Sequence, residues 1–195
     1  MRLPSVTTLV GNELDGRRKK FSDSIRGADD CIYGIPFNAR RVVKFNPVDK
    51  SLKEIGPDLL GVGGWKWYRG VLANNGSIYC IPSYPRRNKI LKIDTLNETV
   101  TLLDTELPET GDGMWCSGAL AHDGCIYCMP FNAHRILKFN PEDESAASVG
   151  EDLGEDHQHD MEMNYEDTVL GTNGWFLYGI PYCSNHIVRF NPIDA

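Results

Sequence analysis

One short phrase occurs four times along this chain, and this repeat limits the possible folds more than any other feature. The copies are CIYGIP at 31–36, SIYCIP at 77–82, CIYCMP at 125–130 and FLYGIP at 176–181. Their final prolines, at positions 36, 82, 130 and 181, are 46, 48 and 51 residues apart. A period of this length predicts an array of one supersecondary unit.

Each repeat contains four apolar runs separated by turn-forming residues. In the second repeat, the run at 67–73 is followed by Asn74-Asn75-Gly76, then by SIYCIP, KILKI at 89–93 and TVTLL at 99–103. Such runs are typical of strands, and four antiparallel strands in a unit of this length predict a propeller blade. We therefore expect an all-β fold, a four-bladed β-propeller of four-stranded antiparallel blades. It would form one domain over 1–195, with blades at approximately 21–60, 67–107, 115–153 and 165–195.

The two ends of the chain carry complementary parts of a repeat. Residues 6–14 (VTTLVGNEL) resemble 52–59 (LKEIGPDL), which contain the fourth run of the first repeat. The chain ends with FNPIDA at 190–195, where a fourth run is due. We therefore expect the N-terminal strand, within residues 5–14, to complete the last blade and close the ring, because this pairing removes open strand edges. The alternative is an open fragment of a longer array.

Composition argues against some classes of function. With 41% hydrophobic and 24% charged residues, the chain has the composition of an ordinary soluble globular protein. A net charge of −7 argues against a general nucleic-acid binder, whose binding surface is basic. No apolar run reaches membrane-spanning length, so we expect no membrane partner. The first residues, MRLPS, lack the apolar core of a secretory signal, which favours a cytoplasmic location.

Two of the six cysteines, Cys125 and Cys128, form a C-x-x-C pair, which can indicate zinc binding or redox chemistry. Here both lie in one expected strand, where residues three apart point to opposite faces. Cys31 and Cys80 occupy the same two repeat positions. We therefore interpret these cysteines as reduced thiols of the core rather than as a zinc site or a disulfide.

Basic and aromatic residues recur in loops that a propeller would bring to one face. Arginine suits carboxylate or phosphate, and aromatic rings stack on sugars, bases or peptide side chains. The candidate ligand-binding residues are Arg40, Arg41, Arg86, Arg87, His134, Arg135, His186, Trp65, Trp67 and Trp115.

Two alternatives compete with this site. The arginines could form a solvated rim or pair with Asp58, Glu109 and Asp112. Trp67 and Trp115 stand before the first strands of their repeats, as Phe21 and Tyr165 do in theirs. Since a residue type repeated in every blade is first of all a packing element, packing between blades is the favoured interpretation of these four aromatic residues.

One loop departs from the repeat. Residues 151–164 form the most acidic stretch and hold two of the five histidines. Imidazole and carboxylate ligands suit a divalent transition metal, and the loop offers His157, His159, Asp156 and Asp160. A physiological metal site here is the minority interpretation, because loops of this composition commonly bind metals adventitiously. No other cofactor is expected.

The phrase G-x-I-Y-x-I-P followed by I-L-K-F-N-P resembles the repeats of β-propeller proteins related to the kelch and gluconolactonase-type groups. It also resembles tandem-repeat propeller proteins of unassigned role from marine algae. The resemblance covers essentially the whole chain and implies the fold, but it carries over no catalytic residue. Kelch repeats place a double glycine after the second strand, whereas Gly63-Gly64 precedes a first strand here. The channel-facing acidic ligands of metal-dependent lactonases have no clear counterpart.

Three hypotheses about function follow. The leading one is a non-catalytic binding or interaction module that presents one loop face to a protein partner or an anionic small ligand. The second is a metal-dependent, lactonase-like hydrolase with its site at the channel mouth, and the third is an assembly subunit whose loops serve only contacts. The sequence shows no nucleophile elbow, phosphate loop or H-E-x-x-H motif. The question of catalysis is therefore open, with a binding role favoured.

Overall fold

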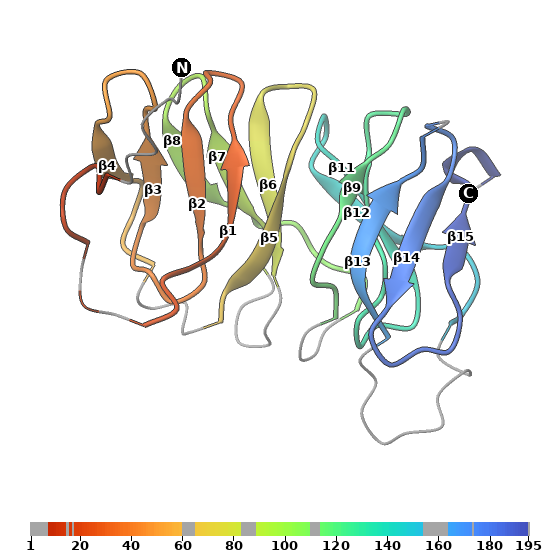
Figure 1. Cartoon of the computed structure of the whole chain (residues 1–195). Helices are drawn as coiled ribbons and strands as arrows, with labels where there is room; N and C mark the ends of the chain where they lie inside the picture. Colours follow the sequence, from red (N-terminus) through yellow and green to blue (C-terminus); the bar gives the residue numbers. More distant parts are fainter. Residues whose placement is uncertain are drawn as a thin grey trace, which may run out of the picture.

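The chain folds into four antiparallel β-sheets, one for each sequence repeat (Figure 1). The computed structural model describes residues 8–14, 16, 18–59, 65–82, 89–109, 114–153, 164–172 and 174–194. The first sheet contains β1 (Phe21–Arg26), β2 (Ile32–Pro36), β3 (Val42–Phe45) and β4 (Leu52–Ile55). The second contains β5 (Trp67–Leu72), β6 (Ser77–Pro82), β7 (Leu91–Asp94) and β8 (Thr99–Leu102).

The third sheet contains β9 (Ala119–Leu120), β10 (Ile126–Cys128), β11 (Ile136–Asn140) and β12 (Ser145–Val149). The fourth contains β13 (Tyr165–Leu170), β14 (Leu177–Pro181) and β15 (Val188–Phe190), followed by a short 3₁₀ helix, η3 (Pro192–Asp194). In every sheet, strands that are consecutive in the chain are neighbours in space. This meander follows from the short turns between the apolar runs.

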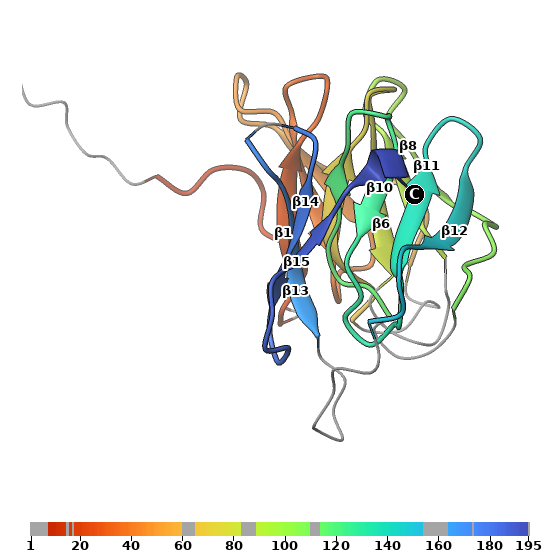
Figure 2. The ribbon, with the colours of Figure 1, turned by 90° about the vertical axis from the view of Figure 1, so that its right-hand side faces the viewer.

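The predicted all-β, four-bladed β-propeller architecture is confirmed. The first strands of successive sheets pack against one another in turn, β1 against β5, β5 against β9 and β9 against β13. The first and fourth blades lie at the two ends of the series, and the views in Figures 1 and 2 together show that the blades follow an arc.

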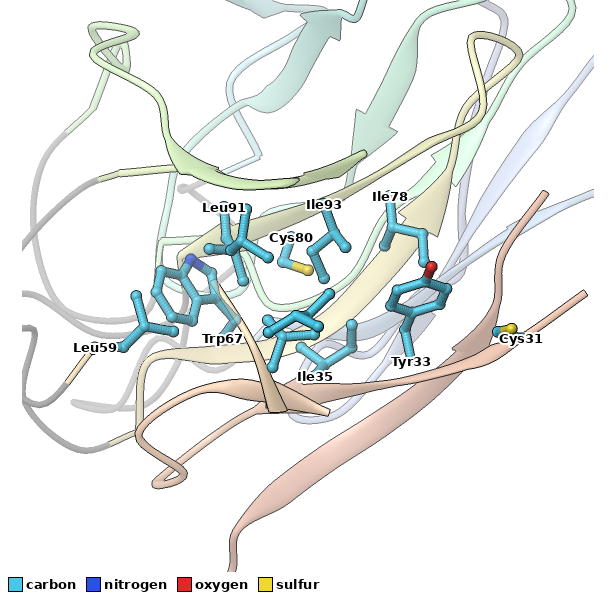
Figure 3. Packing of buried hydrophobic residues seen from close by; sticks show 12 residues of the cluster. Cys31, Tyr33, Ile35, Leu59, Trp67, Ile78, Cys80, Leu91 and Ile93 are labelled. Carbon is cyan, nitrogen blue, oxygen red and sulfur yellow. The ribbon is translucent and has the colours of Figure 1, made fainter. Parts of the chain in front are cut away.

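The core lies between neighbouring blades. Tyr33 and Ile35 of β2 are buried against Trp67, Ile78 and Leu91 of the second blade (Figure 3). A second strand is therefore covered on both faces, and every residue of β6 is buried. This explains why the repeated phrase is apolar throughout rather than alternating. Burial of each large apolar side chain contributes roughly 2 kcal/mol.

A tyrosine of the second strand hydrogen-bonds across two of the blade interfaces. The Tyr33 hydroxyl lies 3.3 Å from the carbonyl oxygen of Thr95, and the Tyr79 hydroxyl lies 3.3 Å from that of Pro141. Thr95 and Pro141 occupy the same repeat position. The recurrent tyrosine thus fills the interface and satisfies a backbone carbonyl of the next blade.

A lysine of the third strand forms an ion pair across the same two interfaces. Lys44 Nζ lies 2.5 Å from Glu98 Oε1, and Lys92 Nζ lies 2.7 Å from Glu144 Oε1. Lys44 also lies 2.6 Å from Asp29 Oδ2 of its own blade. Burial alone would lower the pKa of Lys44, but hydrogen bonds to Asp29 and Glu98 outweigh burial and raise it. Successive blades are therefore joined by apolar packing and by a charged pair.

The cysteines of the repeated phrase are core residues, as the repeat register predicts. Cys125 and Cys128 are buried in different apolar clusters, on opposite faces of their sheet. Cys31 and Cys80 are buried at the equivalent positions. All six cysteines are free thiols, and of these Cys183 alone is exposed.

Closure of the ring by the N-terminal strand is not seen among the described residues, and this corrects the sequence-based expectation. The fourth sheet has three strands, and residues 8–14 form no strand. Gly11 lies against Leu52 of the first blade, with a φ of +79° that interrupts an extended conformation. The reason is geometric, because the segment sits at the opposite end of the arc from β15 (Figure 1). Residues 5–7 lie outside the described part of the chain.

Candidate functional site

The loops that the sequence singled out gather at one end of the blades, the lower end in Figure 1. In the first and third blades, a backbone hydrogen bond joins the turn after the second strand to the segment that enters the next blade. Lys66 N donates to Phe37 O at 3.1 Å, and Asn164 N donates to Phe131 O at 2.7 Å. We call this end the loop face and define it by residues 37–41, 65–66, 131–135 and 182–186.

Two arginines of the loop face make the same hydrogen bond to the backbone in two different blades. Arg41 Nη1 donates to the carbonyl oxygen of Gly56 at 2.6 Å, and Arg135 Nη1 donates to that of Gly150 at 3.2 Å. The two glycines occupy equivalent positions after a fourth strand, and each has a φ of +78°. Arg41 and Arg135 thus stabilise the end of a blade, a role that sequence reasoning did not assign to them.

The other described basic residues of the rim also have partners within the protein. Arg40 forms an ion pair with Asp58, which was the competing interpretation of this residue. His134 Nδ1 lies 3.5 Å from Asp152 Oδ1, and the backbone N–H of His186 donates to Ser184 Oγ at 3.3 Å. Arg86 and Arg87 lie outside the described residues. The described basic residues of the loop face are therefore bonded within the protein.

Trp67 and Trp115, two of the candidate ligand-binding residues, lie in the core. Their exposed fractions are 1% and 0%. The indole N–H groups donate to the carbonyl oxygens of Lys89 and Arg135, each at 3.0 Å. Because both rings are covered by neighbouring blades, they offer no surface to a ligand. Their geometry agrees with the packing interpretation.

Trp65 differs from these two tryptophans because it is 49% exposed. Its ring is stacked on Phe37, with centroids 5.6 Å apart and planes 26° apart. Phe37 in turn meets Tyr68 edge to face at 6.2 Å. Lys19 Nζ lies 5.4 Å from the Trp65 ring. We call Phe37, Trp65 and Tyr68 the aromatic platform.

The backbone of Trp65 is held in an unusual conformation. Its φ is +60°, a left-handed value that is rare for a bulky residue. The Asn38 side-chain oxygen accepts a hydrogen bond from the Trp65 N–H at 3.1 Å. Such a conformation costs on the order of 1–3 kcal/mol and tends to cluster at functional sites. The surrounding structure thus fixes a large ring partly in solvent at an energetic cost.

A polar cluster lies beside the platform and joins the first strands of the second and fourth blades. Tyr68 Oη donates to Glu166 Oε1 at 3.3 Å. Arg69 Nη1 lies 3.1 Å from Asp167 Oδ2, and both side chains are partly exposed. Burial, followed by the nearby Glu166 carboxylate, raises the pKa of Tyr68. Tyr68 is therefore a neutral hydroxyl at physiological pH and serves as a donor.

Sequence reasoning missed this polar cluster, although one signal could have found it. The two residues after the leading aromatic do not repeat between blades. They read Ser22-Asp23, Tyr68-Arg69, Cys116-Ser117 and Glu166-Asp167. A variable polar pair on the innermost strand of a repetitive fold indicates a role other than blade packing.

Cys116 lies beside this polar cluster and is not an activated nucleophile. Cys116 Sγ lies 3.2 Å from the carbonyl oxygen of Glu166, and burial, followed by that residue's carboxylate, raises the pKa of Cys116 to about 12. A thiol of this kind stays protonated and is a poor nucleophile. The described residues contain no group of three or more side chains suited to hold a metal ion. His157, His159, Asp156 and Asp160 lie outside them.

No family model and no curated protein matches this chain. Solved structures of β-propeller proteins do resemble it. A catalytically inactive virginiamycin B lyase from Staphylococcus aureus, solved with quinupristin, matches over 92% of this chain and 55% of its own, with 12% identity and a TM-score of 0.68. A streptogramin B lyase structure matches over 92% and 54%, with 14% identity and a TM-score of 0.68.

A third structure of the same fold has a different role. An auxiliary nutrient binding protein from Bacteroides thetaiotaomicron VPI-5482 matches over 88% of this chain and 39% of its own, with 11% identity and a TM-score of 0.59. At these identities the likeness establishes the fold alone. This chain spans about half the length of the two lyases. Within the described residues, no helix has the length and apolar character needed to cross a membrane. The chain has the β-propeller fold, and its function must be argued from its own site.

Proposed function

We propose that this chain is a non-catalytic binding module that takes a protein partner on the aromatic platform of its loop face. The observation that carries the proposal is Trp65, a half-exposed ring stacked on Phe37 and held in a left-handed backbone conformation. Rigid, exposed aromatic rings dominate the binding energy of protein interfaces. The platform would receive an apolar or aromatic side chain of the partner.

The surroundings of the platform suit a polypeptide better than a small anion. Arg41 and Arg135 are bonded to backbone carbonyls, and Arg40 is paired with Asp58. Capture of an anion by these groups would have to displace bonds that the protein already makes. The Tyr68 hydroxyl and Arg69, bonded to Glu166 and Asp167, form a polar border beside the aromatic rings, which is the usual arrangement of an interface.

Panning a random-peptide phage library on the protein tests this proposal. We expect selected peptides to lose at least about 30-fold in affinity for Trp65→Ala, as for a binding hot spot. Trp175→Ala is the matched control, because Trp175 is 53% exposed and belongs to a different loop. It should change affinity by less than about twofold.

Two outcomes would count against the proposal. Peptides that bind Trp65→Ala as well as wild type would show that the platform is not the site. If affinity instead depends on Arg40 and on ionic strength and does not change in Trp65→Ala, an anionic ligand at the basic residues of the loop face is favoured. The metal-dependent, lactonase-like hydrolase stays a prediction, because its candidate ligands lie outside the described residues.

A further inference from the structure

Each blade presents one side to the blade that follows it, and we call this side its trailing face. A central position of this face, in the second strand, holds Ile35, Ile81 and Met129 in the first three blades. Their exposed fractions are 0%, 3% and 1%. The equivalent residue of the fourth blade is Ile180, and it is 41% exposed.

A neighbouring position, just before or within the third strand, shows the same contrast. Val42, Ile90 and Ile136 are exposed by 0%, 0% and 2%, whereas Ile187 of the fourth blade is 63% exposed. Clustered exposed aliphatic side chains mark interaction surfaces. The fourth blade therefore presents one half of an interface that the chain builds three times between its own blades.

The outer edge of the same blade is also open among the described residues. β15 pairs with β14 on one side and with no described strand on the other. In the first three blades the third strand always pairs with a fourth. An edge with unpaired N–H and C=O groups is a template for one more strand.

The other end of the arc holds a segment that matches this edge. Gly11 lies on Leu52 in the way that Gly56 lies on Val100 of the second blade. A Cβ added to either glycine would come within 2.9 Å and 2.5 Å of the Leu52 and Val100 Cβ atoms, and the φ angles are +79° and +78°. Leu52 and Val100 are equivalent in the repeat. Residues 8–14 thus lie where the outer strand of a preceding blade would end.

Both apolar residues before Gly11 are exposed, and for Val10 this differs from its counterparts in the first two blades. Leu9 is 99% and Val10 is 45% exposed, whereas Ile55 and Leu103, the equivalents of Val10, are 9% and 6% exposed. Leu9 and Val10 occupy the sequence positions of a fourth strand, and no described third strand lies beside them. Within one chain, β15 lies at the opposite end of the arc and cannot supply that strand (Figure 1).

We propose that a second copy of this chain supplies it, so that two copies associate head to tail. The N-terminal segment of one copy pairs with β15 of the other, and the trailing face around Ile180 and Ile187 packs on the first blade. Two such junctions, related by a two-fold axis, close a ring of eight blades, a number known among propellers. The arc matches 52–55% of the lyase chains with TM-scores of 0.66 and 0.68, so four blades arranged in this way also occur as part of a longer chain.

Sedimentation equilibrium of the intact chain tests the proposal. We expect a monomer–dimer equilibrium between 21.9 kDa and twice that mass. Ile187→Glu should weaken dimerisation at least about 100-fold, because it buries an unpaired charge at both junctions. Leu96→Glu is the matched control, since Leu96 is 64% exposed and the equivalent residue of the third blade is Glu142. Unchanged circular dichroism and Tm would show that both variants are folded.

A charge-reversal cycle tests which faces meet. Between blades, a third-strand lysine meets a turn glutamate, as Lys92 meets Glu144 at 2.7 Å. At the proposed junction the equivalent residues are Arg189 of one copy and Lys50 of the other, both cationic. Lys50→Glu or Arg189→Glu alone should tighten the dimer about tenfold, because each turns a repulsive pair into an attractive one at two junctions. The double variant should return to within about twofold of wild type.

Several results would overturn the proposal. One is that wild type and Lys50→Glu both stay monomeric through the submillimolar range. A dimer that survives Ile187→Glu would place the contact elsewhere. A dimer that Ile187→Glu disrupts but the charge variants leave unchanged would indicate two trailing faces packed back to back. Species larger than a dimer would show that the junctions do not close a ring.

Discussion

Removal of the buried ammonium group of Lys44 is the perturbation that most sharply probes how the blades are joined. The Lys44 side chain is 9% exposed, whereas its partners Asp29 and Glu98 are 20% and 39% exposed. In Lys44→Met, Asp29 keeps hydrogen bonds from Tyr33 and from a backbone N–H, and Glu98 keeps Lys53. We therefore expect a loss of about 2 kcal/mol in the free energy of unfolding, below the 3–5 kcal/mol of a buried pair left without compensation.

Urea unfolding followed by circular dichroism measures this loss, and Lys53→Met provides the control. Lys53 also pairs with Glu98 but is 52% exposed, so its removal should cost less than about 0.5 kcal/mol. Hydrogen bonds from Lys44 and then Lys53 lower the pKa of Glu98. For Asp29, burial would raise the pKa, but the hydrogen bond from Lys44 and several others outweigh it and lower the pKa.

These pKa shifts determine how the loss of unfolding free energy in Lys44→Met depends on pH. A carboxyl whose pKa is lowered on folding stabilises the protein above its ordinary pKa of about 4, and this contribution disappears as pH falls through the lowered value. The difference between wild type and Lys44→Met should therefore shrink below about pH 4. Equal losses for Lys44→Met and Lys53→Met, or a loss that is independent of pH, would refute the reasoning.

Two further predictions concern thiols and glycines. Ellman's reagent should titrate Cys183 rapidly in the native protein and the other five thiols only after unfolding, because those are buried; a second fast thiol would contradict the core assignment. Gly56→Ala should lower the free energy of unfolding by about 3 kcal/mol, because a Cβ there combines a φ of +78° with a 2.5 Å approach to the Val100 Cβ. Gly124→Ala has a similar φ of +80° but ample space around the added Cβ, so it should lower the free energy of unfolding by only about 1 kcal/mol. Equal losses for the two variants in thermal unfolding would contradict the contact between residue 56 and Val100.

The fold could be predicted because the same pattern of apolar runs and turns occurs in every repeat. A phrase such as SIYCIP, apolar at nearly every position, requires cover on both faces, and a propeller supplies this cover by stacking blades. The register of the repeat also identified Cys125 and Cys128 as core residues of opposite faces. Closure of the ring could not be predicted in this way. The angle between packed blades sets the curvature of the arc, and the length of the sequence repeat does not reveal that angle.

The candidate site could be predicted only in part. The sequence placed Trp65 in a loop and favoured packing for Trp67, and the exposed fractions of the two rings, 49% and 1%, agree with this difference. The partners of Arg41 and Arg135 are backbone carbonyl oxygens, which no side-chain pattern reveals. Tyr68 and Glu166 are 98 residues apart and belong to blades that are not consecutive. Only the three-dimensional arc brings them together.

All four blades share one pair of lateral faces, and we propose that the two outermost faces of the arc bind each other in a second copy. Amide hydrogen exchange of the intact chain at low and high protein concentration measures this most directly. We predict that the amides of residues 8–10, and those amides of Val188–Phe190 that point away from β14, exchange rapidly in dilute solution. They should become protected together as concentration rises, and Ile187→Glu should abolish this protection. Exchange of both segments that does not change with concentration would contradict the claim.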